Sequence, residues 1–317
     1  MLRSASAAAN PLNNSTAQNT GSSNTLTNII TTTTTATTTT TTTTTTTPNN
    51  NPTPPPSGPT TTTQTGFAAG LVVIVRRGDD GDDLSTRVRR LKPGTVSITT
   101  DAANNQTTGT IVVGVNGSHY PATATLQVSG AGNVLASANT PATVLASANR
   151  FATVLASANS PATCTCEFLS WGVWASSVPD PRNNGQTYTA LGTYVAGTGT
   201  PTVQLPTMGS ATYNGFMAGF ASHHGEISPL TGSYQNTWDF RAHSGNLNIT
   251  FGDRHLTGTT QASAGSGFTG SFGHTGRLNG SFFASPSDAA AYQAGTFSIG
   301  GHHSSYQASG IFASQRR

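Results

Sequence analysis

The sequence is poor in charged residues. In its second half, where we expect a folded domain, positive and negative residues are equal in number. Only 8% of the 317 residues are charged, and the formal net charge is +3 at pH 7. From Cys164 to the C-terminus, six arginines stand against six acidic residues. Nucleic-acid-binding domains present a dense basic face to the phosphates, so we expect no nucleic-acid partner.

Cysteines and long apolar runs are also scarce. Two cysteines in the whole chain exclude a disulfide framework. The longest apolar run, residues 66–75, is far shorter than the roughly 20 residues that a spanning helix needs, so this is not an integral helical membrane protein. No apolar stretch follows Met1 as a signal peptide requires.

Aromatic residues are scarce in the first half only. Of the 23 aromatic residues, 20 lie in the 154 residues from Cys164 onward. Burying one such side chain contributes about 1.5–3 kcal/mol, against a backbone entropy cost of about 1–2 kcal/mol per ordered residue. We therefore expect the main core in the C-terminal half.

Low-complexity sequence opens the chain. Residues 1–65 contain an unbroken threonine run, Thr37–Thr47, followed by a proline-rich stretch. This composition offers no apolar face to bury, so we predict a disordered segment. It is either an O-glycosylated stalk or an expanded repeat without a selected role.

Two further segments precede the aromatic half. Residues 66–130 are predicted to form a small β unit, with an Asn-Gly turn at Asn116 between two alternating strands. Residues 131–163 contain a ten-residue repeat in which Val134–Asn139 recurs as Val144–Asn149 and Val154–Asn159. This period is shorter than that of solenoids. We interpret the repeat as a linker of short strands or alanine-rich helical turns.

Residues 164–317 alternate between apolar and polar side chains, which indicates β-strands. Leu247, Ile249 and Phe251, for example, share one face. Regular strand spacing with glycines inside the strands favours a closed barrel. We therefore predict an all-β protein whose C-terminal half is an antiparallel up-and-down barrel of about eight strands, filled by aromatic side chains. The predicted strands begin with 164–174 and continue at 187–195, 210–220, 234–240, 246–251, 267–272, 278–284, 295–299 and 306–313.

Two other features complete this half. Polar residues such as Gln235, Asp239 and Asn248 occupy the outer face, which argues against a barrel exposed to lipid. One helix is predicted at Ser285–Gly295, since a serine cap, a proline, an acid, alanines and a closing glycine follow one another.

Several segments of this half resemble a known family. Gly280-Ser281-Phe282-Phe283, followed by a proline-initiated turn and Ala294–Ile299, resembles the C-terminal barrel of transferrin-binding protein B. Tyr213-Asn214-Gly215 is similar to a Tyr-x-Gly strand of that family. The stretch Cys164–Trp174 is similar to the barrel that ends many proteobacterial envelope proteins, some with FecR-like regions. The resemblance covers residues 164–317 and implies a binding barrel in the cell envelope or outside the cell, with a host or envelope macromolecule as partner.

The sequence also departs from that family. Ser160–Thr163, which precede Cys164, are not a lipobox. Neither a handle domain, nor a second barrel, nor a FecR-like region is recognisable. Transferrin binding is therefore not transferred to this chain.

Cysteine and histidine are the first candidates for chemistry. On a strand Cys164 and Cys166 would face the same way, and a bridge between them would strain the short loop, so we interpret them as inert or loosely redox-active thiols. They supply too few soft ligands for a metal site. The pairs His223-His224 and His302-His303 would each offer only one ligand per strand face.

The remaining candidates have ordinary structural explanations. Residues 79–83 include four aspartates but lack the closing glutamate of a calcium loop. Residues 265–270 are glycine-rich but lack the Lys-Ser/Thr of a phosphate loop, so we expect a strand turn. We expect Trp171 and Trp174 in the core rather than in a sugar platform. Glu167, Glu226 and Asp239 are isolated carboxylates, and we assign no catalytic, cofactor-binding or metal-ligating residue and no cofactor.

These observations favour a non-enzymatic bacterial envelope or cell-surface protein whose barrel binds a macromolecule or ligand. The loops expected to make contact are residues 179–186, 197–206 and 223–232. One alternative is a structural passenger without a ligand. Another is a barrel hydrolase, which would need histidines or carboxylates converging in a polar cavity.

Overall fold

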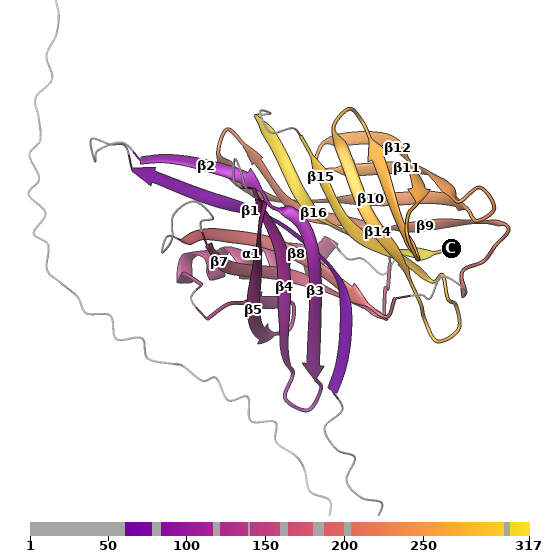
Figure 1. The fold of residues 1–317 in the computed structure, drawn as a ribbon, viewed down its shortest axis with the longest axis horizontal. Helices are drawn as coiled ribbons and strands as arrows, with labels where there is room; N and C mark the ends of the chain where they lie inside the picture. Colours follow the sequence, from indigo (N-terminus) through magenta and orange to yellow (C-terminus); the bar gives the residue numbers. More distant parts are fainter. Residues whose placement is uncertain are drawn as a thin grey trace, which may run out of the picture. The chain divides into compact units, whose positions relative to one another are not determined.

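The computed structural model describes residues 61–77, 84–116, 121–138, 140–158, 164–179, 187–199, 204–300 and 305–317 (Figure 1). Nearly all of the predicted disordered segment and the aspartate-rich turn lie outside these residues. Residues 61–65, which we expected in the disordered segment, begin a strand. The described chain is all-β with one helix, which confirms the predicted fold class.

Eight strands and the helix come first in the chain. They are β1 (Thr61–Arg77), β2 (Leu84–Arg90), β3 (Lys92–Asp101), β4 (Gln106–Asn116), β5 (Pro121–Ala131), β6 (Val134–Ala136), α1 (Ala142–Ala158), β7 (Leu169–Pro179) and β8 (Thr187–Gly197). Eight more strands follow: β9 (Ser210–His223), β10 (Glu226–Asp239), β11 (Ser244–Phe251), β12 (Arg254–Ala262), β13 (Gly267–Phe272), β14 (Gly276–Phe283), β15 (Tyr292–Ile299) and β16 (Tyr306–Arg316).

The C-terminal barrel consists of β9 to β16 in sequence order. Each strand pairs antiparallel with the next, and β16 closes the ring against β9. The predicted antiparallel up-and-down barrel of about eight strands is thus confirmed. Aromatic side chains fill its interior, as expected from their concentration in this half; the fully buried ones include Tyr213, Tyr234, Phe251, Phe268, Phe272, Phe282, Phe297 and Phe312.

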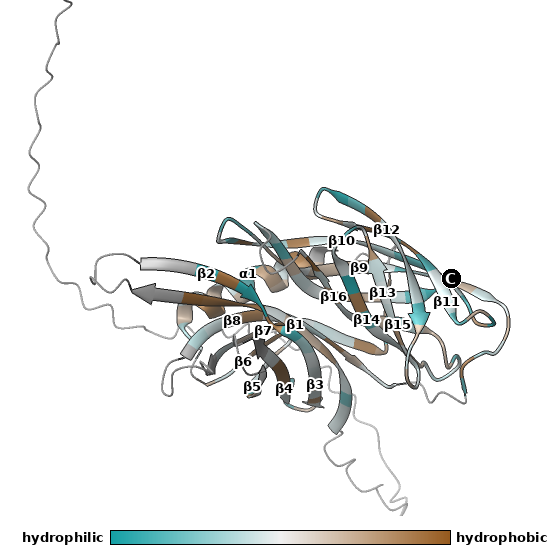
Figure 2. Ribbon diagram, turned by 45° about the horizontal axis from the view of Figure 1, so that its top comes forward, coloured by the Kyte–Doolittle hydropathy of each residue, from teal (hydrophilic) through white to brown (hydrophobic). Residues whose placement is uncertain are grey.

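A second barrel, which the sequence did not reveal, precedes it. The long strand β1 pairs with β3 through its first half and with β8 through its middle, which closes a ring through β3, β4, β5, β6, β7 and β8. The strand β2 pairs with the last part of β1, and the short β6 runs parallel to β7. The strands β7 and β8, which we expected in the C-terminal barrel, therefore complete this N-terminal barrel. In Figure 2, β4 includes a hydrophobic stretch, whereas β11 and β12 include hydrophilic stretches.

Trp174 sits at the centre of the N-terminal barrel. Its side chain is fully buried, and its indole N–H donates a hydrogen bond to the Thr193 carbonyl at 3.2 Å. The ring lies over Gly70 and Gly192, which face each other across β1 and β8. A Cβ on Gly70 would lie 2.9 Å from the indole, and one on Gly192 would lie closer still. The predicted core position of Trp174 thus requires glycine beneath it.

The repeat adopts two structures from one sequence. The first copy of Val-Leu-Ala-Ser-Ala-Asn contributes the strand β6, whereas the second copy, and the third as far as Ala158, lie in α1. The helix follows Pro141, whose carbonyl accepts hydrogen bonds from the N–H groups of Val144 and Leu145. Ala148, Phe151 and Leu155 recur at helical spacing and are buried. Burial of this apolar face stabilises the helix that contains the second and third copies.

The two barrels share a third apolar core, which we call the seam. It is formed by outward-facing side chains of both barrels together with one face of α1. Rings meet across it: Phe151 and Phe220 lie 4.4 Å apart, and Trp171 and Phe216 lie 5.4 Å apart. The strands β8, β9 and β16 are consequently buried on both faces along most of their length.

The predicted helix at Ser285–Gly295 is wrong. The Ser285 hydroxyl accepts a hydrogen bond from the N–H of Asp288 at 3.1 Å, as an N-cap would, but no helix follows. Instead β15 begins at Tyr292, which pairs with Phe283 and Gln315. The hydrogen bonds between neighbouring strands of the closed barrel outweigh the helix propensity of the alanines.

Replacing Gly192 by alanine should destabilise the protein by about 1–3 kcal/mol, because the added methyl group collides with the Trp174 ring and the backbone of β1. Urea unfolding followed by tryptophan fluorescence would measure this. Gly199→Ala is the matched control, since a Cβ there meets none of the described residues within 4 Å. Equal stability of the two variants would contradict the packing described for Trp174.

Candidate binding surfaces

A polar network lies inside the C-terminal barrel. The Tyr234 hydroxyl and the Asn236 amide both donate to Gln293 Oε1, at 2.9 and 3.0 Å. The Thr260 hydroxyl donates to Asn236 Oδ1 at 3.3 Å. Gly245 leaves room for this amide, since a Cβ on Gly245 would lie 2.4 Å from Asn236 Oδ1 and collide with it. These groups satisfy one another within the aromatic core, while Gln293 Nε2 has no hydrogen-bond partner among the described residues.

Tyr234 of this network and two further tyrosines, Tyr213 and Tyr194, are buried. Burial raises the pKa of Tyr234 well above its usual range and also raises the pKa of Tyr213, whose hydroxyl donates to the Ala290 carbonyl at 2.8 Å. The neighbouring Arg316 lowers the pKa of Tyr213 and Asp288 raises it, both less than burial does. In the N-terminal barrel, burial raises the pKa of Tyr194. Each hydroxyl therefore stays protonated in the folded protein at any ordinary pH.

An open groove of about 680 Å³ crosses the outer face of β9 to β12, and we call it the polar groove. Asn214, Gln235 and Asn248 stand directly opposite one another on three adjacent strands. The Gln235 amide donates to Asn214 Oδ1 at 3.0 Å. The sequence pattern had already placed Gln235 and Asn248 on the outer face, and the structure adds the strand neighbours that align them.

Hydroxyl groups and one histidine complete the polar groove. The hydroxyl groups of Ser233 and Thr250 form a hydrogen bond of 2.9 Å. His255, on β12, lies opposite Thr250. Arg317 also lines the groove, and no acidic side chain is among its described lining residues. The groove thus presents donors and acceptors that are almost all uncharged.

The two cysteines form a disulfide, contrary to our expectation of free thiols. We expected an extended strand, in which Cα atoms two residues apart lie roughly 6.6 Å from each other. Instead, β7 begins only at Leu169, and Cys166 has a φ of +45°, so that the two Cα atoms lie 5.2 Å apart. That separation falls in the usual range for a disulfide.

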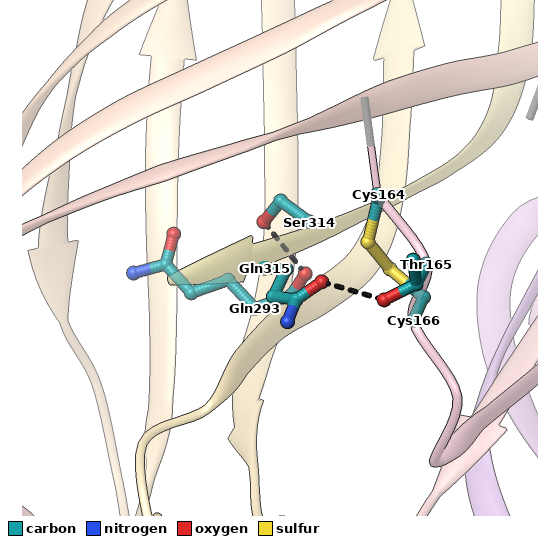
Figure 3. The surroundings of a disulfide bond; sticks show 6 residues. All are labelled: Cys164, Thr165, Cys166, Gln293, Ser314 and Gln315. Carbon is teal, nitrogen blue, oxygen red and sulfur yellow. Dashed lines mark hydrogen bonds between the residues drawn. A yellow bond between two sulfur atoms is a disulfide. The ribbon is translucent and has the colours of Figure 1, made fainter. Parts of the chain in front are cut away.

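The disulfide segment is attached to the C-terminal barrel (Figure 3). Both cysteines are buried in the seam. Thr165, between them, donates a hydrogen bond from its hydroxyl to Gln315 Oε1 at 3.0 Å. Figure 3 also shows Gln293 pointing away from the disulfide, while Ser314 donates to the Gln293 carbonyl at 2.9 Å. The segment thus joins the strand β7 of one barrel to β16 of the other.

The histidine pair differs from the prediction. His223 ends β9, but His224 lies in the turn with a φ of +51°, so the two rings contact each other at 4.2 Å instead of facing opposite ways. The expected loop 223–232 is a two-residue turn, because Glu226 already pairs with His223. His302 and His303 lie outside the described residues, as do residues 180–186 of the first predicted loop and residues 200–203 of the second. The part of the chain that the structure describes holds no group of three or more metal-binding side chains.

The other candidates have structural roles. Asp239 Oδ1 accepts hydrogen bonds from the backbone N–H groups of Arg241 and Ala242 and so caps the turn after β10. Gly265 has a φ of +66° in the turn before β13, the strand turn expected there. In the described residues, no helix is both long and apolar enough to cross a bilayer.

No protein-family model matches the sequence, and no curated protein matches it. Among solved structures, the chain is similar to transferrin binding protein B from serogroup B Neisseria meningitidis, with 13% identity over 81% of this chain and 77% of that one and a TM-score of 0.32. It is similar to the N-lobe domain of lactoferrin binding protein B of Moraxella bovis, with 11% identity over 80% and 99% and a TM-score of 0.37. A surface lipoprotein shares 13% identity over 78% and 98%, with a TM-score of 0.33. Likeness at this level says nothing about ligands.

The buried tyrosines predict an alkaline limit of stability. Because burial raises the pKa of Tyr213 and Tyr234 above the unfolded value of about 10, their contribution is complete below pH 10 and is lost as the pH rises. The free energy of unfolding should then fall by up to about 1.4 kcal/mol per pH unit for each tyrosine. Urea unfolding between pH 8 and 11 would measure the slope. The double variant Tyr213→Phe, Tyr234→Phe should make the slope shallower and leave the part due to Tyr194, whose pKa burial also raises. An unchanged slope would contradict this assignment.

Proposed function

We propose that this is a non-enzymatic envelope or cell-surface protein of a bacterium, and that its C-terminal barrel is a binding module for a macromolecule. The observation that carries the proposal is the polar groove on the outer face of β9 to β12. The interior of this barrel is occupied by aromatic side chains and the polar network. A partner would therefore meet the outer face rather than the inside of the barrel.

The chemistry of the polar groove suits a large, hydrogen-bonding partner. Asn214, Gln235 and Asn248 offer amide donors and acceptors side by side, and their uncharged character avoids the desolvation cost of burying ions. Asparagine and serine supply adaptable hydrogen bonds in other macromolecular interfaces. The groove is open rather than enclosed, which suits a macromolecule better than a small substrate.

The disulfide supports a location outside the cytosol. Disulfides form and persist in oxidising compartments such as the periplasm and the cell exterior, whereas cytosolic thiols stay reduced. Cys164 and Cys166 lie in the seam that joins the barrels. The motifs Gly280–Phe283 and Tyr213–Gly215, which resemble those of transferrin-binding protein B, agree with an envelope protein.

Binding to the native envelope tests the polar groove. Gln235→Lys would place a charged chain in the middle of the amide row, and we expect at least tenfold weaker binding of labelled protein to envelope fractions of the source organism. Asn279→Lys is the matched control, because Asn279 is an exposed residue on β14, outside the groove. Equal loss in both variants would contradict a role for the groove. Absence of saturable binding by the unaltered protein would favour a structural passenger.

A further inference from the structure

A second pocket, of about 330 Å³, lies where α1 meets both barrels, and we call it the seam pocket. Its walls are mostly apolar: Phe151 comes from α1, Leu191 from β8, and Phe220 and Ile227 from β9 and β10. The polar groove lies on another part of the C-terminal barrel and shares no lining residue with it. A volume of this size is at the small end of the range for small-molecule sites, roughly 300–1,000 Å³.

The helix presents one face to the seam pocket. Val144, Ser147 and Phe151 line it, and their spacing of three and four residues places them one above another on α1. Arg150 lines it beside Phe151. The pocket therefore depends on the middle of the repeat being helical.

The repeat changes its sequence at this pocket. A four-residue spacer follows each copy of the repeat. The spacers after the first and third copies begin Thr140-Pro141 and Ser160-Pro161, whereas the spacer after the second copy begins Arg150-Phe151. Proline at position 151 would break α1, since it lacks an N–H and clashes with the preceding turn. The two residues that depart from the repeat are thus the ones that keep the helix continuous and line the pocket.

Among the described residues, Arg150 is the only one with a charged side chain that lines the seam pocket. Its side chain is exposed, and among the described residues no carboxylate or other acceptor bonds to it. A guanidinium group matches the two oxygens of a carboxylate through paired hydrogen bonds. An apolar pocket with one free guanidinium at its side is complementary to an amphipathic anion.

We propose that the seam pocket binds an amphipathic carboxylic acid. The aliphatic chain would lie against Phe151, Phe220 and Ile227, where it replaces water on apolar surface. The carboxylate would pair with the Arg150 guanidinium at the solvent-facing side. This site is independent of the polar groove, so either assignment can fail without the other.

Isothermal titration calorimetry of the full chain with decanoate, kept below its micelle concentration, tests the proposal. We expect saturable binding at one site per chain and at least tenfold weaker binding of decanol, which lacks the charge. Arg150→Gln should weaken decanoate binding at least tenfold, and Arg150→Lys should weaken it less. Arg241→Gln is the charge control, since Arg241 is exposed in the turn after β10 and should leave the affinity unchanged.

A second pair of variants tests the pocket itself. Ser147→Phe would place a ring in the seam pocket and should abolish binding, whereas Ala146→Phe, on an exposed neighbouring position outside the lining, should not. Circular dichroism would confirm that both variants fold. Absence of saturable decanoate binding, or binding that survives Ser147→Phe, would overturn the site. Loss with Ser147→Phe but not with Arg150→Gln would overturn the carboxylate assignment.

Discussion

The burial of β8, β9 and β16 on both faces is the constraint on which the structure depends. In β9, Phe216, Ala218 and Phe220 face the seam, while Met217 and Ala221 face the interior of the C-terminal barrel. The strand β9 thus contributes side chains to two cores, and each barrel covers apolar residues on the outer face of the other. Separating the barrels would expose Trp171, Phe151 and their ring partners to water.

Ligands can bind only at surfaces that this arrangement leaves exposed to solvent. Aromatic side chains and a polar network occupy the inside of the C-terminal barrel, and the seam covers one side of its wall. The opposite strands, β10 to β12, keep amide and hydroxyl groups exposed to solvent. The two places at which we propose ligand binding are the polar groove and the gap where α1 does not completely fill the seam.

Local sequence patterns predicted the C-terminal barrel. They did not predict features that depend on contacts between segments far apart in the chain. Alternating aromatics revealed β11, β13 and β14, but β12 was missed because Gly258 and Thr260 occupy its inner positions. Closure of the N-terminal barrel pairs β1 with β8, more than 100 residues away, which no local signal shows. We attributed strand glycines to curvature alone, whereas Gly192 also makes room for Trp174. The disulfide was missed because we assumed an extended backbone at Cys166.

The central claim is that the protein matures outside the cytosol and acts there as a binding module. The most direct test is the redox state of Cys164 and Cys166 in cells of the source organism, quenched with acid and alkylated under denaturing conditions before any reduction. The structure predicts that mass spectrometry finds neither cysteine alkylated until the sample is reduced, and both alkylated afterwards. Two alkylated cysteines without reduction would contradict both the disulfide and the proposed location.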